Sequence, residues 1–199
     1  MKKNNKGFSL IELSIVLIIM GLLIAGVTGG ARLIKSAQLR SVVTEATNYR
    51  TAFNTYYAQF GKVPGAVDGD PNIVSSGALS ALFNEGIIDR EPTSDAVASK
   101  FGKGAKWFLI NAAAEGTVAT KVTDFASLNV LVFSKAEDFS EQPLTNRETY
   151  NIDDKIDDGD STKGLLRGIQ YSGAEASNAA YDDTESSTRD FGFVMKLDF

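Results

Sequence analysis

The sequence contains no cysteine and no histidine. Without cysteine, no disulfide can hold the fold together, and thiol catalysis is excluded. Without histidine, Ser-His-Asp triads and the usual zinc ligand sets are excluded as well. Chemistry that relies on Ser/Lys pairs or on paired carboxylates remains open, but few enzyme classes are left. We therefore predict that the chain is not an enzyme.

Basic residues are scarce in the later part of the chain. The formal net charge is −5, and acidic side chains outnumber basic ones between residues 151 and 190. A protein that binds DNA or RNA usually presents a basic stripe that neutralises phosphates. This region has none, so we predict no nucleic-acid partner for it.

The apolar residues gather near the N-terminus. Residues 8–31 form one apolar block in which Glu12 is the only charged residue. The run over residues 13–31 is uncharged and close to the ~20 residues that a helix needs to cross a bilayer. Three lysines precede the block, and lysines on one side of a span tend to stay in the cytoplasm. The pattern predicts a single-pass membrane helix with a cytoplasmic leader.

Glu12 is unusual because a charge inside a membrane segment costs ~2.5 kcal/mol or more. A secretory signal peptide would have a shorter apolar region and a cleavage site at its far end, for which residues 29–31 are a weak match. An uncleaved anchor would leave Glu12 hydrated at the membrane surface. The long run, with the carboxylate at its start, favours a third explanation, in which a partner neutralises Glu12.

Residues 6–13, Lys-Gly-Phe-Ser-Leu-Ile-Glu-Leu, resemble the processing signature of type IV prepilins and type II secretion pseudopilins. The resemblance covers residues 1–35. It implies that a prepilin peptidase cuts between Gly7 and Phe8 and that the new amino group of Phe8 is methylated. It also implies that Glu12 meets the N-terminal amine of a neighbouring subunit. Such a buried ion pair forms only in the right axial register, so Glu12 would set the register of assembly.

The apolar block departs from the family pattern in one respect. Many pilins carry a proline there, whereas this chain has Gly21, Gly26, Gly29 and Gly30. Each glycine inside a helix costs ~0.8–1 kcal/mol relative to alanine. Close packing against another helix and local unwinding during assembly would both explain them.

The helical pattern continues beyond the membrane block. Six apolar residues recur at spacings of three and four: Val42, Ala46, Tyr49, Phe53, Tyr56 and Phe60. Gly61 and Pro64 are helix stop signals, so we predict one helix over residues 8–60. The stripe predicts that the second half of this helix packs against a globular core.

The remaining pattern predicts a loop, two short helices, three strands and an exposed loop. In chain order these are the loop 65–71, the helix 77–88, the strands 106–112 and 127–134, the helix 147–156, the loop 172–190 and the strand 191–199. The predicted fold class is α+β, a long N-terminal helix packed against a small antiparallel sheet. The predicted segments are the leader 1–7, the transmembrane assembly helix 8–31, the amphipathic half 32–60 and the globular region 61–199.

An acidic cluster surrounds Gly159. Its members are Asp153, Asp154, Asp157, Asp158 and Asp160. Carboxylates around a glycine turn can bind calcium. The EF-hand template fits poorly, because a loop that starts at Asp154 places Ile156 and Leu165 where ligands are needed. A solvated acidic turn and a calcium site both stay open, and calcium is the one cofactor that the sequence suggests.

Together these features predict a structural subunit, major or minor, of a type IV pilus-like filament. The expected partners are other subunits, prepilin peptidase and an inner-membrane assembly platform. The alternatives are a type II secretion pseudopilin and a periplasmic binding domain that uses residues 1–31 only as an anchor. The expected location is the inner membrane with a periplasmic globular region, followed by an extracellular pilus or a periplasmic pseudopilus.

Overall fold

The computed structural model describes residues 9–67, 70–113, 125, 128–136, 140–172, 175–178, 181 and 191–197. The chain divides into two units, Met1–Gln38 and Leu39–Phe199. Helix α1 (Leu10–Phe60) contributes to both. Its N-terminal part, residues 10–38, is the helical portion of the first unit. Its C-terminal part, residues 39–60, belongs to the second unit, which we call the head.

The N-terminal part of α1 has an apolar surface. Large side chains such as Leu17, Leu22 and Val27 are 63%, 70% and 71% exposed. Two hydroxyls in the apolar run bond back to their own helix: Ser14 Oγ donates to the Ile11 carbonyl at 2.9 Å, and Thr28 Oγ1 donates to the Ile24 carbonyl at 3.0 Å. Such internal bonds let a helix carry hydroxyls in lipid. Among the described residues, α1 is long and apolar enough to cross a membrane.

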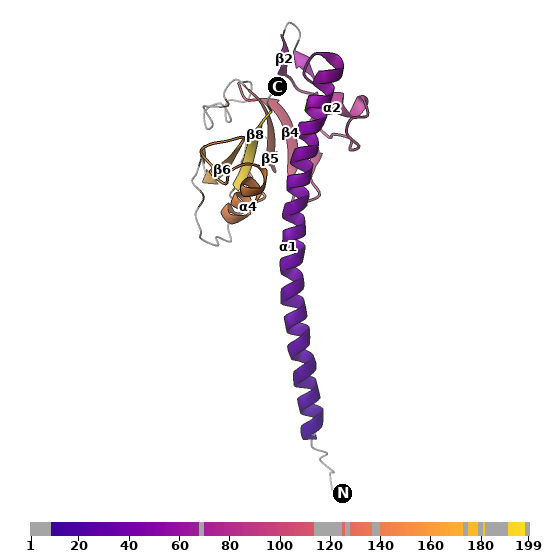
Figure 1. Cartoon of the computed structure of the whole chain (residues 1–199), viewed down its shortest axis with the longest axis vertical. Coiled ribbons are helices and arrows are strands. Elements are labelled where there is room, and N and C mark those ends of the chain that lie inside the picture. The colour runs from indigo at the N-terminus through magenta and orange to yellow at the C-terminus, as the bar shows by residue number, and fades with distance from the viewer. Residues whose placement is uncertain are drawn as a thin grey trace. The chain divides into compact units, whose positions relative to one another are not determined.

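The head is built on one six-stranded antiparallel sheet (Figure 1). Its strands are β3 (Ala96–Ala98), β4 (Lys106–Asn111), β5 (Asn129–Ser134), β6 (Leu166–Ser172), β7 (Glu175–Asn178) and β8 (Phe191–Lys196). They lie in the order β3-β4-β5-β8-β6-β7. The C-terminal strand β8 therefore pairs in the middle of the sheet, between β5 and β6, and its residues 191–195 are buried.

Side chains along each strand alternate between the two faces of the sheet, and each face carries an apolar layer. The register aligns Trp107 with Phe133 and Phe133 with Phe193 across β4, β5 and β8. The ring centroids of these neighbours lie 4.6 Å and 5.1 Å apart, close enough for direct aromatic packing. Phe108 and Val132 point to the opposite face, where a smaller buried cluster covers the sheet.

The C-terminal part of α1 packs on the face that carries the aromatic row. Val42, Ala46 and Phe53 are fully buried in the same cluster as Trp107. Tyr49 lies with its ring centroid 5.6 Å from that of Trp107. The helix ends at Phe60, and Gly61 follows with a positive φ of 65°, which glycine adopts without strain.

Shorter elements complete the head. The strands β1 (Ala66–Val67) and β2 (Asp70–Val74) form a small antiparallel pair, and α2 (Ala78–Asn84) follows. Helix α4 (Asn146–Ile156) packs against β6 and β8. It begins with a full capping box, because Thr145 accepts from the Glu148 N–H while the Glu148 carboxylate accepts from the Thr145 N–H.

The α+β prediction is confirmed, as are α1, α4 and the three predicted strands, which are the central strands β4, β5 and β8. Four details were wrong. Helix α2 ends at Asn84 rather than at residue 88, and Phe60 is 42% exposed rather than part of the core. The predicted loops 65–71 and 172–190 contain β1, the start of β2 and the whole of β7. The strands β3 and β6 were not predicted at all.

Candidate functional site

The processing residues Gly7 and Phe8 lie outside the described residues, whereas Glu12 lies in the first turn of α1. Its carboxylate turns back to the helix start, where Oε2 accepts from the Ser9 N–H at 2.8 Å. A carboxylate at this position is also favoured by the helix dipole. In the single chain, Glu12 is therefore held at the N-terminal end of its own helix, by the backbone N–H of the residue that follows Phe8 in the sequence.

The four glycines of the N-terminal part of α1 lie on an open surface among the described residues. The helix runs without a break from Leu10 to Phe60. A Cβ placed on Gly21, Gly26, Gly29 or Gly30 would meet nothing within 4 Å. The open surface around them is compatible with a close-packed neighbour, and the helix is not unwound there in the single chain.

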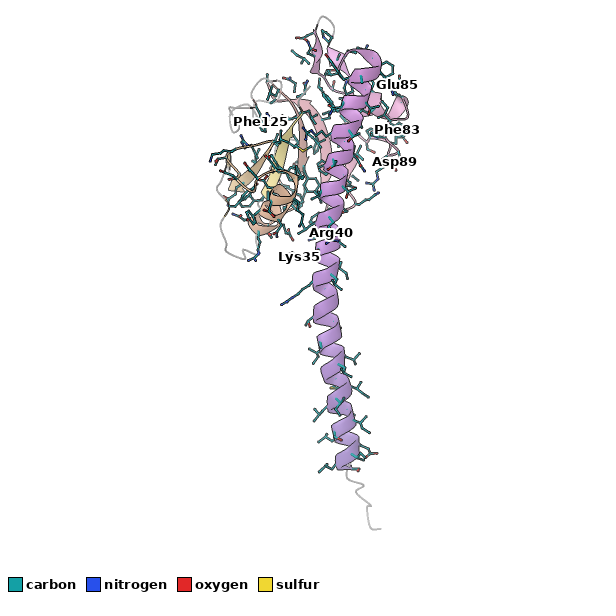
Figure 2. The ribbon with its side chains drawn as sticks, viewed as in Figure 1. Lys35, Arg40, Phe83, Glu85, Asp89 and Phe125 are labelled. Carbon is teal, nitrogen blue, oxygen red and sulfur yellow. The ribbon has the colours of Figure 1, made fainter. Side chains whose placement is uncertain are left out.

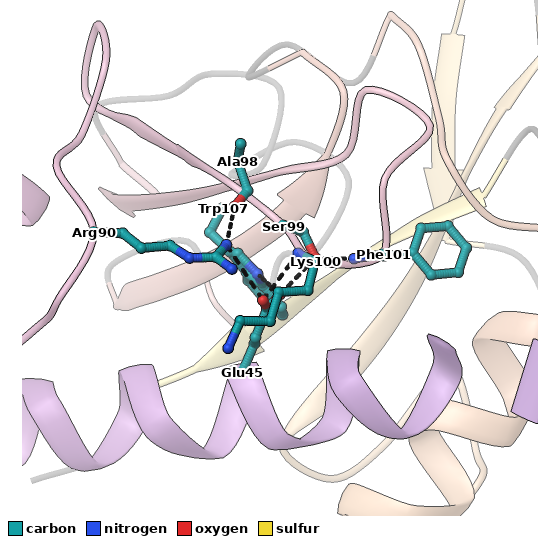
Figure 3. Close-up of polar contacts among 7 residues, drawn as sticks. All are labelled: Glu45, Arg90, Ala98, Ser99, Lys100, Phe101 and Trp107. Carbon is teal, nitrogen blue, oxygen red and sulfur yellow. Dashed lines mark hydrogen bonds and ion pairs between the residues drawn. The ribbon is translucent and has the colours of Figure 1, made fainter. Parts of the chain in front are cut away.

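A buried polar cluster centres on Glu45 in the head (Figure 3). Glu45 lies on α1 and is 8% exposed. Its carboxylate accepts from Trp107 Nε1 at 2.8 Å, from Ser99 Oγ at 2.5 Å and from the Lys100 N–H at 2.9 Å. Arg90 Nη1 lies 3.5 Å from Glu45 Oε1 and also bonds to the Ala98 carbonyl. One carboxylate therefore ties α1 to β4, to the turn after β3 and to the segment after α2.

The environment of Glu45 also affects Tyr49, one turn along the helix. Burial raises the pKa of the Tyr49 phenol well above its usual value, and the nearby Glu45 carboxylate raises it further. The phenol is therefore neutral at physiological pH. It contributes packing rather than proton transfer.

A pocket of about 650 Å³ opens beside this cluster. It lies between the C-terminal part of α1 and the segment after α2, whose Glu85 and Asp89 lie across α1 from Phe125 (Figure 2). Charges of both signs line it, including Glu45, Arg90 and Lys100. The carboxylate and guanidinium are already engaged with each other and with the backbone. The arrangement therefore links the wall of the pocket to the core of the head.

Of the five aspartates predicted to bind calcium, three lie together and two do not. Asp153, Asp157 and Asp158 lie together, with one carboxylate oxygen of each within 4.8 Å of the others. Asp160 turns away, because its Oδ1 accepts from the Thr162 N–H at 3.0 Å and its Oδ2 pairs with Lys163 at 3.1 Å. Asp154 is exposed on α4 and is not part of the group.

Asp153 is the buried member of this group. Burial raises its pKa to about 6, against the opposing effect of a 2.8 Å hydrogen bond from the Tyr181 hydroxyl, and the neighbouring Asp158 and Asp157 carboxylates raise it further. The sequence pattern identified this cluster. No sequence signal identified the Glu45 cluster, since its donors come from distant parts of the chain.

Residues 2–28 match the family model of the prokaryotic N-terminal methylation motif. This motif is the signature of type IV pilins and pseudopilins, so the resemblance noted in residues 6–13 is confirmed. The match ends within the N-terminal part of α1 and does not include the head. No curated protein matches the chain. The motif supports a type IV pilin-like or pseudopilin subunit, a structural class that is typically not enzymatic, and the apolar helix suggests membrane anchoring.

Proposed function

We propose that this chain is a structural subunit of a type IV pilus-like filament. A prepilin peptidase cleaves it between Gly7 and Phe8, and the new amine of Phe8 is methylated. The observation that carries this proposal is the methylation motif at residues 2–28, which opens a helix with an apolar surface. The same helix continues into a separate folded head.

Before assembly, the N-terminal part of α1 holds the subunit in the inner membrane, with the head on the periplasmic side. Its exposed apolar side chains need either lipid or other subunits as neighbours. Exchange of lipid for neighbouring helices during assembly keeps these side chains away from water throughout. The assembly platform of the inner membrane is the expected partner for this transfer.

Glu12 sets the register between subunits. In the single chain its carboxylate is satisfied in part by the Ser9 N–H at 2.8 Å. Cleavage adds a positive amine next to this position, on Phe8. An ion pair between Glu12 and the Phe8 amine of a neighbour would offset the burial of the carboxylate only at one axial offset, which is how a buried charge gives specificity.

Intact-mass spectrometry of the native protein tests the processing step. The expected mature chain begins at Phe8 and carries one additional methyl group. A protein that keeps its lysine-rich leader would instead support the alternative of an anchored periplasmic domain. Electron microscopy of sheared surface filaments, followed by peptide identification, separates a pilus from a periplasmic pseudopilus.

The role of Glu12 has its own test. Glu12→Ala should still be inserted and cleaved but should assemble poorly, whereas Ser14→Ala, one half-turn away, should assemble normally. The readouts are the mature mass and the amount of filament. Normal filaments from Glu12→Ala would show that this carboxylate does not set the register.

A further inference from the structure

The acidic loop of the head brings three carboxylates into the space that one ion would occupy. One oxygen each from Asp153, Asp157 and Asp158 lies within 4.8 Å of the other two. Calcium binds oxygen ligands at about 2.3–2.6 Å, so two of its ligands lie at most ~5 Å apart. The three oxygens are therefore close enough to share one ion. Three carboxylates at this separation also repel one another without a cation.

Asp153 supplies a second, independent observation. Its side chain is fully buried, and its Oδ1 has no hydrogen-bond partner among the described residues. Its other oxygen, Oδ2, accepts from the Tyr181 hydroxyl at 2.8 Å. Leaving a buried carboxylate oxygen without a partner costs free energy, so we expect a bound ion or donor at Oδ1.

The loop fixes the other two carboxylates by backbone bonds. Asp157 Oδ2 accepts from the N–H groups of Leu165 and Leu166, and Asp158 Oδ1 accepts from the Asp160 N–H at 2.8 Å. Gly164 has a φ of 73°, and a Cβ there would overlap the Asp157 carboxylate. The loop after α4 therefore closes tightly on Asp157 and holds it beside Asp153.

We propose that Asp153, Asp157 and Asp158 bind one calcium ion, which ties the end of α4 to the start of β6. The donor set contains only oxygen, which suits a hard cation and gives no soft ligand for zinc or copper. Magnesium demands nearly ideal octahedral geometry, whereas calcium accepts irregular sets of oxygens completed by carbonyls and water. The proposal is independent of filament assembly, because it concerns a site within the head.

Terbium, which binds calcium sites, tests direct binding in the full chain in detergent micelles. Tyr181 donates to Asp153, and its ring lies 5.7 Å from that of Tyr150. Excitation of these tyrosines should therefore produce terbium emission that calcium displaces. Calcium should also raise the melting temperature of the head by a few degrees, since a ligand that binds only the folded state stabilises it.

Two variants with the same change of charge decide whether the site is specific. Asp158→Asn removes a ligand at an exposed position and should weaken calcium binding at least about tenfold. Asp154→Asn removes an exposed carboxylate on the same helix end that is not in the group, and should leave the affinity within about threefold. The emission of the buried Trp107 checks that both variants are folded.

Two results would overturn the proposal. One is the absence of both terbium emission and a melting shift with calcium raised to about 10 mM, well above the ~10⁻³ M dissociation constants of weak extracellular calcium modules. The other is equal loss of affinity in Asp158→Asn and Asp154→Asn, which would indicate diffuse attraction to an acidic surface. A retained melting shift in Asp154→Asn together with its loss in Asp158→Asn supports the site.

Discussion

The two parts of helix α1 differ in which side chains they expose, although they form one continuous helix. In the N-terminal part, residues 10–38, the large apolar side chains are exposed, and Leu33 is still 73% exposed. In the C-terminal part, residues 39–60, most large apolar side chains are buried in a narrow stripe, and most exposed positions before the exposed Phe60 are polar. There, the exposed hydroxyls of Thr47, Thr51 and Thr55 each bond to a carbonyl one turn earlier.

The neighbours of a helix, rather than its own hydrogen bonds, decide which residues it tolerates. Both parts have complete internal backbone bonding as one α-helix. The N-terminal part needs an apolar environment from outside the chain, while the C-terminal part receives one from the sheet. Four pairs of substitutions test this difference between the two parts of α1.

Truncation of a large apolar side chain should separate the two parts most clearly. Phe53→Ala should lower the free energy of unfolding of the head by about 3–5 kcal/mol, because Phe53 is fully buried. Leu17→Ala should change it by less than about 0.5 kcal/mol, since Leu17 is 63% exposed. Urea unfolding in micelles, followed by fluorescence of the chain's only tryptophan, Trp107, measures both. If both variants lost equal unfolding free energy, the two parts of α1 would not differ in how they contribute to the stability of the head.

A new charge should impair the N-terminal part of α1, through membrane insertion, and have little effect in the C-terminal part. Ile19→Asp places a carboxylate near the middle of the apolar run and should reduce membrane insertion by about 2.5–3.5 kcal/mol. Thr51→Asp lies on the exposed side of the C-terminal part and should leave insertion unchanged. The fraction of protein resistant to alkaline extraction from membranes is the measurement. Full resistance of Ile19→Asp would mean that a carboxylate in the apolar run does not weaken insertion, which would contradict the prediction.

The Glu45 cluster tests how strongly the C-terminal part is fixed to the head. Glu45→Gln keeps the shape but turns an NH₂ group towards N–H or O–H donors such as Trp107 Nε1. It should cost about 1–3 kcal/mol, the penalty for buried polar groups that lose their partners. Glu85→Gln, at an exposed position beside the same pocket, should stay within about 0.5 kcal/mol. If the two variants lose equal stability, the buried network is not what fixes α1.

The smallest expected effect on stability comes from N-terminal helix capping. Helix α4 has a full capping box at Thr145 and Glu148, whereas α1 shows the returning carboxylate of Glu12 on the Ser9 N–H. Thr145→Ala should lower head stability by about 1 kcal/mol. Arg147→Ala, exposed in the first turn of α4, is the control and should have almost no effect. Thermal melting in micelles measures both, and a silent Thr145→Ala would mean that packing alone holds α4.

The sequence predicted the features that depend on near neighbours along the chain. The stripe from Val42 to Phe60 has helical spacing, and five of its six members are buried as expected, Phe60 being the exception. The central strands were visible because apolar residues dominate them, as in Val130–Phe133 of β5. The methylation motif at residues 2–28 is likewise a local signal.

The strands that the sequence did not predict carry weaker local signals. Strand β3 has only three residues, and β2 is mostly exposed, so neither shows an apolar alternation. In β6, Gly168 and the buried Arg167 interrupt the pattern; the glycine is needed because a Cβ would lie 2.7 Å from the Tyr181 ring. Pairing with β8, rather than local propensity, makes this segment a strand.

The amino-acid sequence by itself determined the long helix, its apolar first part, the processing motif and the α+β class, because each follows from residues that lie close together in the chain. Only the tertiary structure decided the partners of Glu45, which lie 54, 55 and 62 residues further along. It also decided which three of the five aspartates lie together. The physical reason is the same in both cases: a buried charge is stabilised by groups that folding brings within about 3 Å, and sequence spacing does not encode that distance.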